Sequence, residues 1–229
     1  SYPGGEMLFR AAACTGALYH IDLYLVSGDL EDLEAGVYQF SPQDFSLRKL
    51  RQGDYRGALV GAAGAQPAMV NAPAMLICAS TFWRNAWKYQ SRAYRHCFWD
   101  SGTILANLLA AAAARRLPAR VVLGFVDAAV SELLSLDSQR EAALSLVALG
   151  YTATQTAGPS PAIASLALET EPLSKREVDY PAMREMHQAS ALASAEEVIA
   201  WRGEKRVGGF KDERENELRS IALQPFNDA

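Results

Sequence analysis

The feature that most constrains the fold is a long apolar helix near the middle of the chain. Residues 104–114 form the most apolar run, rich in alanine, and two arginines and Pro118 then end it. The run is well short of the roughly 20 residues that span a bilayer, so no membrane partner is expected. With the residues before it, the pattern predicts one long central helix over residues 89–116, buried in a core.

Segments on both sides of this helix have the patterns of β-strands. Residues 18–26 alternate apolar and polar positions, which predicts a strand with one wetter face. Residues 142–150 fit either a helix or a strand. The remaining candidates are a hairpin at 36–40 and 45–50, a buried strand at 74–79, a strand or loop at 121–125, and short helices at 54–63 and 128–134. The set predicts an α+β fold with a mainly antiparallel sheet.

The composition changes at Thr152, which divides the chain into two expected parts. Residues 1–150 are predicted to form one domain, and residues 151–229 a linker followed by a helical C-terminal arm or connector. The linker is rich in Ser, Thr, Pro and Gly. Ser194 and Glu197 have the spacing of a capping box at a helix start. Residues 202–219 are dense in charge and are expected to form an arm.

Composition and missing motifs exclude several function classes. The 229 residues are 50% hydrophobic and carry a net charge of −4 without a long basic run, so nucleic acid is not an expected partner. The three cysteines are odd in number and form no CxxC pair, which favours a reduced, cytoplasmic protein. The three histidines lie far apart in the sequence, so no metal site is expected. Neither GxSxG nor GxGxxG occurs.

Cations and aromatic residues are crowded together in residues 87–96, WKYQSRAYRH. If this stretch is helical, Lys88, Arg92 and His96 share one face. One interpretation is a solvated cationic face. The other is an anion-binding or proton-transfer site, in which a partly desolvated lysine exchanges protons with a neighbouring tyrosine.

Two segments of small residues allow a ligand to approach the backbone closely. Cys14, Thr15, Gly16 and Ala17 follow Arg10 and come just before the first predicted strand, where backbone N–H groups can meet a planar or anionic ligand. The second segment is Leu123-Gly124-Phe125. Either segment alone is compatible with an ordinary tight loop.

Taken in order, these segments resemble the nitroreductase-like flavoproteins, and among them the SagB-type dehydrogenase branch that includes azoline dehydrogenases. The resemblance covers about the first 150 residues. It is carried by residues 10–19, 23–26 and 35–38, by Trp87-Lys88-Tyr89 with Arg92, by 100–102 and 107–112, by Gly124-Phe125 with Asp127, and by 133–137 and 149–150.

The resemblance implies a sheet of four or five strands flanked by helices around the long central helix, and an intertwined homodimer with FMN at the subunit interface. By motif match, Lys88 and Tyr89 are the pair that handles protons while hydride moves to or from flavin N5. The implied enzyme is either a dehydrogenase of a small or peptide-derived heterocycle, as in the oxidation of an azoline to an azole, or an NAD(P)H-dependent reductase of nitro or quinone compounds. The Lys-Tyr pair favours the dehydrogenase. The other cofactor-binding residues that it implies are Arg10, Cys14, Thr15, Gly16, Ala17, Arg92, Leu123 and Gly124.

Departures from the family pattern leave an alternative open. Cys14 stands where relatives usually carry a serine, and the family's arginine-rich segment for FMN phosphate has no counterpart in this sequence. These departures favour a non-catalytic module that acts as a dimerisation or substrate-binding scaffold in a larger protein. An unrelated α+β hydrolase or transferase is a third hypothesis. Residues 177–181 and 187–190 resemble the connector to a second module, or an arm that wraps a partner subunit.

Overall fold

The computed structural model describes residues 9–153, 156–168 and 173–203. These residues form a six-stranded sheet in the order β3-β2-β1-β4-β6-β5, and every neighbouring pair is antiparallel. The strands are β1 Ile21–Ser27, β2 Gly36–Ser41, β3 Ser46–Gln52, β4 Ala74–Thr81, β5 Ala119–Val122 and β6 Glu141–Leu149. The predicted α+β fold is confirmed. Its sheet has six strands instead of four or five, and β6 is the segment that was ambiguous in the sequence.

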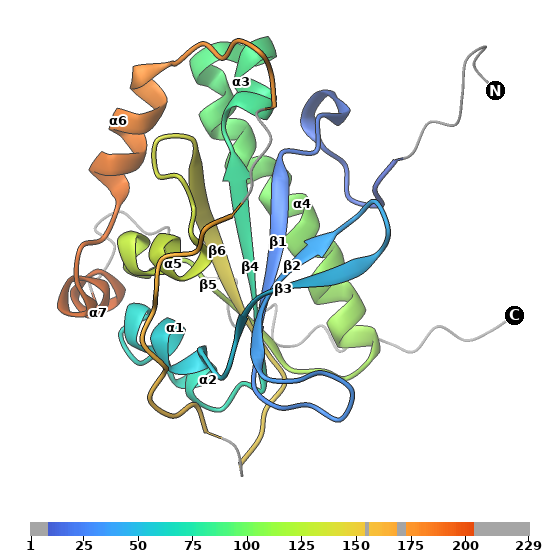
Figure 1. Cartoon of the computed structure of the whole chain (residues 1–229), viewed down its shortest axis with the longest axis vertical. Coiled ribbons are helices and arrows are strands. Elements are labelled where there is room, and N and C mark those ends of the chain that lie inside the picture. The colour runs from blue at the N-terminus through green and yellow to red at the C-terminus, as the bar shows by residue number, and fades with distance from the viewer. Residues whose placement is uncertain (1–8, 154–155, 169–172, 204–229) are drawn as a thin grey trace, which may run out of the picture.

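Helices cover both faces of this sheet (Figure 1). They are α1 Arg56–Ala62, α2 Pro67–Val70, α3 Trp83–Tyr89, α4 Ala93–Ala114, α5 Asp127–Leu134, α6 Pro181–Ser190 and α7 Ala195–Gly203, with 3₁₀ turns η1 Thr15–Ala17 and η2 Gln90–Arg92. One buried cluster joins α1, α2 and α5 to the sheet through Leu59, Met69 and Leu133. A second cluster joins α3 and α4 to the opposite face through Ala86 and Cys97.

Strand β1 lies inside the sheet, and this corrects one prediction. The sequence pattern suggested one wetter face, which included His20 and Tyr24. In the structure Ile21 packs toward α4, Tyr24 and Val26 pack toward α1 and α5, and His20 is fully buried. Because helices cover both faces, alternation along this strand separates two buried environments and not core from solvent.

The long central helix differs from its prediction in two ways. It begins at Ala93, because Gln90 adopts a φ of 53° and a ψ of −144° that separates α3 from α4. It is also not buried all round. Phe98 and Trp99 are 46% and 54% exposed, since only one side of α4 meets the sheet. By length and composition alone the stretch Trp83–Ala114 could cross a membrane, which is weak evidence of a span.

The segment after β6 folds back along the sheet domain. The Ala58 amide donates to Ser160 Oγ at 2.7 Å, and Arg51 Nη1 donates to the Ala164 carbonyl at 2.6 Å. One bond of the predicted capping box is present at α7, where the Glu197 amide donates to Ser194 Oγ at 3.2 Å. The Glu197 side chain accepts from the Ala193 amide at 2.7 Å and not from that of Ser194. The charge-dense segment predicted at 202–219 lies outside the described residues from position 204 onward.

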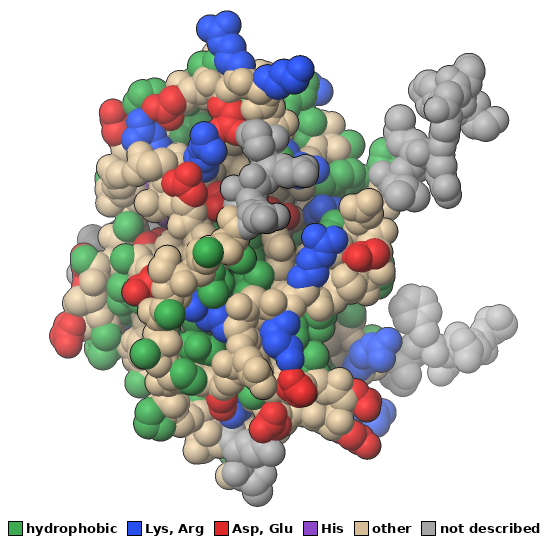
Figure 2. All heavy atoms as spheres, viewed as in Figure 1, with side chains coloured by type: hydrophobic (Ala, Val, Ile, Leu, Met, Phe, Trp, Pro, Cys, Tyr) green, Lys and Arg blue, Asp and Glu red, His purple; other side chains and the backbone are tan. Residues whose placement is uncertain are grey.

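Basic and acidic side chains are interspersed over the face of the molecule shown in Figure 2. This mixture agrees with the small net charge of −4. On this face the charges do not gather into a single basic patch of the kind that attracts nucleic acid.

Candidate functional site

The small-residue turn before β1 meets the end of α3 at Gly16. This glycine has a φ of 66°, and a Cβ built on it would lie 2.7 Å from Tyr89 Oη and 3.3 Å from Lys88 Nζ. A side chain at this position would therefore displace both polar groups. The structure brings together the two residues predicted to handle protons and the turn predicted to lie along the cofactor.

The Lys-Tyr pair occupies the last turn of α3. Lys88 Nζ lies 5.3 Å from the centre of the Tyr89 ring, and the edge of His96 meets the same ring with the centroids 4.6 Å apart. Lys88 is exposed, so the partial desolvation suggested by the sequence is absent in this chain. The break at η2 also removes the predicted shared face, since Lys88 and Arg92 are exposed whereas His96 is buried.

Asp100 on α4 holds the turn in place, and sequence reasoning missed it. Its Oδ2 accepts hydrogen bonds from the Thr15 amide at 2.9 Å, Cys14 Sγ at 3.1 Å and His20 Nε2 at 2.8 Å. Its Oδ1 accepts from Thr15 Oγ1 at 2.8 Å. Burial alone would raise the pKa of Asp100, but the bonds from Cys14, His20 and Thr15 hold that pKa below its usual value. The buried Asp100 carboxylate therefore fixes the residues that lead into β1, from Cys14 and Thr15 at one end to His20 at the other.

The groups around Asp100 are a thiol and an imidazole in their neutral forms. Burial, and then the hydrogen bond to Asp100, raises the pKa of Cys14, so this side chain is a donor and not a reactive thiolate. Burial lowers the pKa of His20, whose Nδ1 lies 2.9 Å from Ser80 Oγ. From the sequence, metal-binding side chains were expected to lie far apart. The structure differs, because the donor atoms of Cys14, His20 and Asp100 all lie within 4.8 Å of one another. Hydrogen bonds already engage these atoms.

A second polar link runs behind Tyr89. Asn85 Nδ2 donates to the Thr15 carbonyl at 3.4 Å, and Asn85 Oδ1 accepts from His96 Nδ1 at 2.8 Å. Both side chains are buried. The link connects the turn, α3 and α4, and it sets the position of His96 against the Tyr89 ring. No motif in the sequence pointed to Asn85.

The two predicted arginines lie beside this site in different settings. Arg10 Nη1 donates to the Ile21 carbonyl at 2.9 Å, and its guanidinium lies 5.2 Å from the centre of the Tyr19 ring. Arg10 thus stabilises the start of β1 through its bond to Ile21. Arg92 is exposed on η2.

Leu123 and Gly124 lie elsewhere. Leu123 borders a hollow of about 480 Å³ between α4, α5 and the C-terminal helices, and Gly124 lies next to this hollow because it contacts Trp201, which lines it. The lining includes neither the Cys14–Ala17 turn nor the Lys-Tyr pair. A Cβ at Gly124 would lie 2.6 Å from the Trp201 ring. The ten predicted site residues therefore fall into two groups, with Leu123 and Gly124 forming the second.

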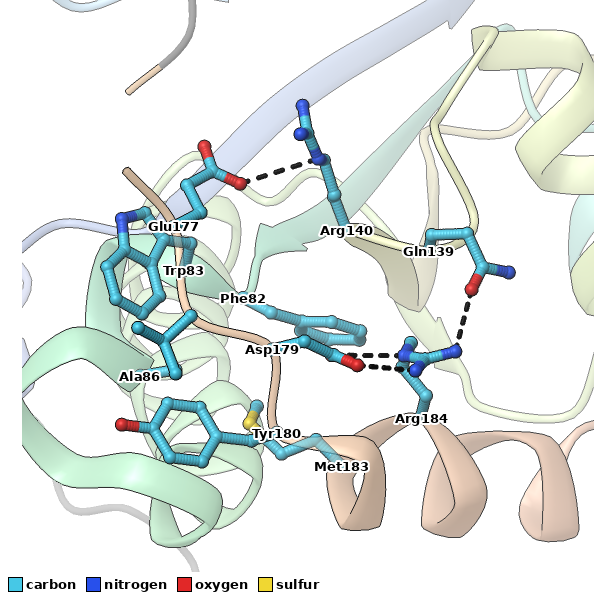
Figure 3. Close-up of a pocket in the computed structure, with 11 residues that line it drawn as sticks. Phe82, Trp83, Ala86, Gln139, Arg140, Glu177, Asp179, Tyr180, Met183 and Arg184 are labelled. Carbon is cyan, nitrogen blue, oxygen red and sulfur yellow. Dashed lines mark hydrogen bonds and ion pairs between the residues drawn. The ribbon is translucent and has the colours of Figure 1, made fainter. Parts of the chain in front are cut away.

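Another pocket, of about 270 Å³, lies between the start of α3 and the start of α6 (Figure 3). Its rim carries two arginines that are already paired: Arg140 Nε lies 3.4 Å from Glu177 Oε2, and Arg184 Nε donates to Asp179 Oδ1 at 3.1 Å. The pairing neutralises the rim. The sequence signal for this pocket was the connector-like stretch 177–181, which supplies part of its lining.

Comparison with known proteins identifies a family. The model described as the nitroreductase family matches residues 8–151. The chain is 27% identical to the microcin B17-processing protein of Escherichia coli, over 63% of this chain and 55% of the relative. It is 30% identical to the trifolitoxin-processing protein of Rhizobium leguminosarum bv. trifolii, over 63% of this chain and 40% of the relative.

Solved structures agree with this result. A crystal structure from Anabaena variabilis, assigned to the nitroreductases, superposes with a TM-score of 0.67 at 28% identity. The match covers 81% of this chain and 38% of that one. The matches thus span less than two thirds of the length of each of these three proteins.

Proposed function

This chain belongs to the nitroreductase family, a family of oxidoreductases, and we propose from that premise that it is an FMN-dependent oxidoreductase in which Lys88 and Tyr89 handle protons. The observation that carries the proposal is the meeting of Lys88 Nζ and Tyr89 Oη at Gly16. An amine and a phenol side by side at an exposed glycine turn provide a proton-transfer pair next to backbone that a ligand can approach.

The residues present fit the ring of a flavin. Gly124 already accepts a flat aromatic ring against its backbone, that of Trp201, and a Cβ would fill the space. Gly16 is exposed, and the polar ends of Lys88 and Tyr89 occupy the side on which a Cβ would lie, so a ligand at this turn would meet both groups. Arg92, exposed on η2, is the group proposed to meet the phosphate.

The proposed reaction removes one proton and one hydride from a substrate ring. FMN, when bound, supplies the hydride acceptor at N5. The Lys88–Tyr89 pair, whose polar ends meet at Gly16, would take the proton from the ring carbon. The Asn85–His96 link holds the Tyr89 ring in place for this transfer.

An azoline is the proposed substrate class. Two relatives are named as processing proteins for a microcin and for trifolitoxin. The resemblance to azoline dehydrogenases supports the proposal that Lys88 and Tyr89 handle the proton. Oxidation of an azoline to an azole needs the two components that this proposal assigns, a base and a hydride acceptor.

A homodimer is the proposed assembly. Tyr94 and Phe98, which line the hollow at Gly124, project about 200° around α4 from His96 and Asp100. In the proposed dimer, one flavin would meet the Gly16 group of one copy and the Gly124 group of the other. The exposed apolar residues of α4, among them Phe98 and Trp99, then provide the contact surface.

A scaffold without catalysis is the second candidate, and the contact between Trp201 and Gly124 is the observation that favours it. The two candidates are separated by titration of the purified chain with FMN, followed by desalting and an absorption spectrum. Retained flavin bands that co-elute with a dimer support the oxidoreductase. A colourless protein supports the scaffold.

Lys88→Ala tests the assigned chemistry. If the pair handles the proton, the variant should retain FMN and lose at least about 100-fold in turnover of an azoline substrate, within the range typical of general acid–base catalysis. Arg84→Ala, a change to an exposed cation on the same helix, is the control. Unchanged turnover in Lys88→Ala with intact flavin would contradict the role.

A further inference from the structure

The indole of Trp201 lies directly on Gly124. A Cβ built on this glycine would be 2.6 Å from Cζ3 and 2.7 Å from Cε3 of the indole, so the ring could not keep its present position. The glycine therefore forms a surface for a flat ring, and α7 supplies the ring that lies on it. The outer side of the indole stays open, since Trp201 is 43% exposed.

The hollow around this surface has the character of a site for a heteroaromatic ring. Its volume of about 480 Å³ falls in the range of small-molecule pockets. Tyr94, Phe98 and Phe125 supply aromatic walls. One edge is polar, where Tyr94 Oη lies 3.2 Å from Ser190 Oγ and 3.5 Å from His187 Nδ1.

The helix that carries Trp201 is lightly held. Val198 is the one fully buried side chain of α7. Beyond that contact, Arg202 donates to the carbonyls of Ala63 and Gly64 at 3.0 and 2.7 Å. Ile199 and Trp201 are 52% and 43% exposed, so their contacts are only half buried. A helix with a single fully buried side chain opens at a lower free energy than the central strands of the sheet.

We infer that Trp201 is a plug: its indole holds the ring-binding surface of Gly124, and the isoalloxazine ring of FMN takes that surface when the indole moves away. The inference rests on the proposed function. Binding requires the displaced form of α7. The apparent affinity for FMN is therefore the intrinsic affinity multiplied by the fraction of molecules in which the indole has moved away. Residues 195–203 must also become more open when FMN binds.

Two measurements test the plug on the full chain. The first is the Kd for FMN, from the quenching of flavin fluorescence, for the wild type and for Trp201→Ala. We expect the variant to bind about tenfold more tightly, which corresponds to about 1.4 kcal/mol. Trp201→Phe retains a ring and should stay near the wild type. Met186→Ala removes a comparably exposed side chain from α6 and should change nothing.

The second measurement is hydrogen exchange of residues 195–203 in the wild type with and without FMN. The plug predicts faster exchange when FMN is bound. Equal affinities of the wild type and Trp201→Ala, or slower exchange on binding, would overturn the plug while leaving the proposed function intact. A failure of every variant to bind FMN would overturn the proposed function itself, and the plug with it.

Discussion

Replacing Asp100 with asparagine removes the charge that anchors the strand entry. Its Oδ2 accepts three hydrogen bonds, from Cys14 Sγ, the Thr15 amide and His20 Nε2. A bond to a charged group contributes roughly 1 kcal/mol more than a neutral one, so three bonds lose about 3 kcal/mol. The lower cost of burying a neutral amide offsets part of this loss. We expect the free energy of unfolding to fall by about 2 kcal/mol.

Urea denaturation followed by tryptophan fluorescence at pH 7 measures this change. Asp29→Asn is the matched control, because Asp29 is exposed and accepts a hydrogen bond from the Ala35 amide. The control should shift the free energy by less than about 0.5 kcal/mol. If Asp100→Asn were as stable as the control, the anchoring role of the carboxylate would be refuted.

The pH dependence provides a second check on the same variant. The pKa of Asp100 is lowered in the folded chain. The carboxylate therefore contributes to the free energy of unfolding above the unfolded pKa of about 3.9, and this contribution is lost as the pH falls through the folded pKa. The stability difference between the wild type and Asp100→Asn should therefore hold from pH 7 to about pH 5 and shrink below about pH 4.

Two further perturbations test the structure away from this carboxylate. Burial lowers the pKa of His20, so the contribution of its neutral form to the free energy of unfolding is present above about pH 6.5 and is lost as the pH falls. His20→Gln should therefore lose less free energy of unfolding between pH 7 and pH 5 than the wild type. Equal losses in urea denaturation would contradict this. A Cβ at Gly57 would lie 2.0 Å from the Gly158 carbonyl oxygen, so Gly57→Ala should speed hydrogen exchange over residues 156–168. Gly61→Ala on the same helix, where nothing lies within 4 Å, is the control, and equal exchange in both variants would argue against that packing.

The two proposed roles of α4 depend on its position at the edge of the core. One side of the helix carries Asp100 and His96, which organise the Lys-Tyr region. The opposite side carries Tyr94 and Phe98, which border the hollow at Gly124. A helix with a single buried side can serve both regions, whereas a fully buried helix could present neither to a ligand.

The family, the antiparallel α+β class and most of the elements could be predicted from the sequence alone. Alternation and turn chemistry are local properties, so β2, β3 and the capping box at Ser194 could be predicted from neighbouring residues alone. The Lys-Tyr motif and the Cys14–Ala17 turn were also visible in the sequence, and the structure brings them together at Gly16. Their shared role in catalysis stays a prediction.

The environment of each residue could be read only from the three-dimensional structure. Asp100 lies 85 residues from Thr15 in the chain, and no local pattern reveals a hydrogen bond across that separation. Neither could periodicity show that helices cover both faces of β1, or that α4 leaves Phe98 exposed. The contact of Trp201 with Gly124 likewise exists because α7 folds back over the sheet domain. Burial depends on what packs against a segment, and for this chain the packing partners come from distant parts of the sequence.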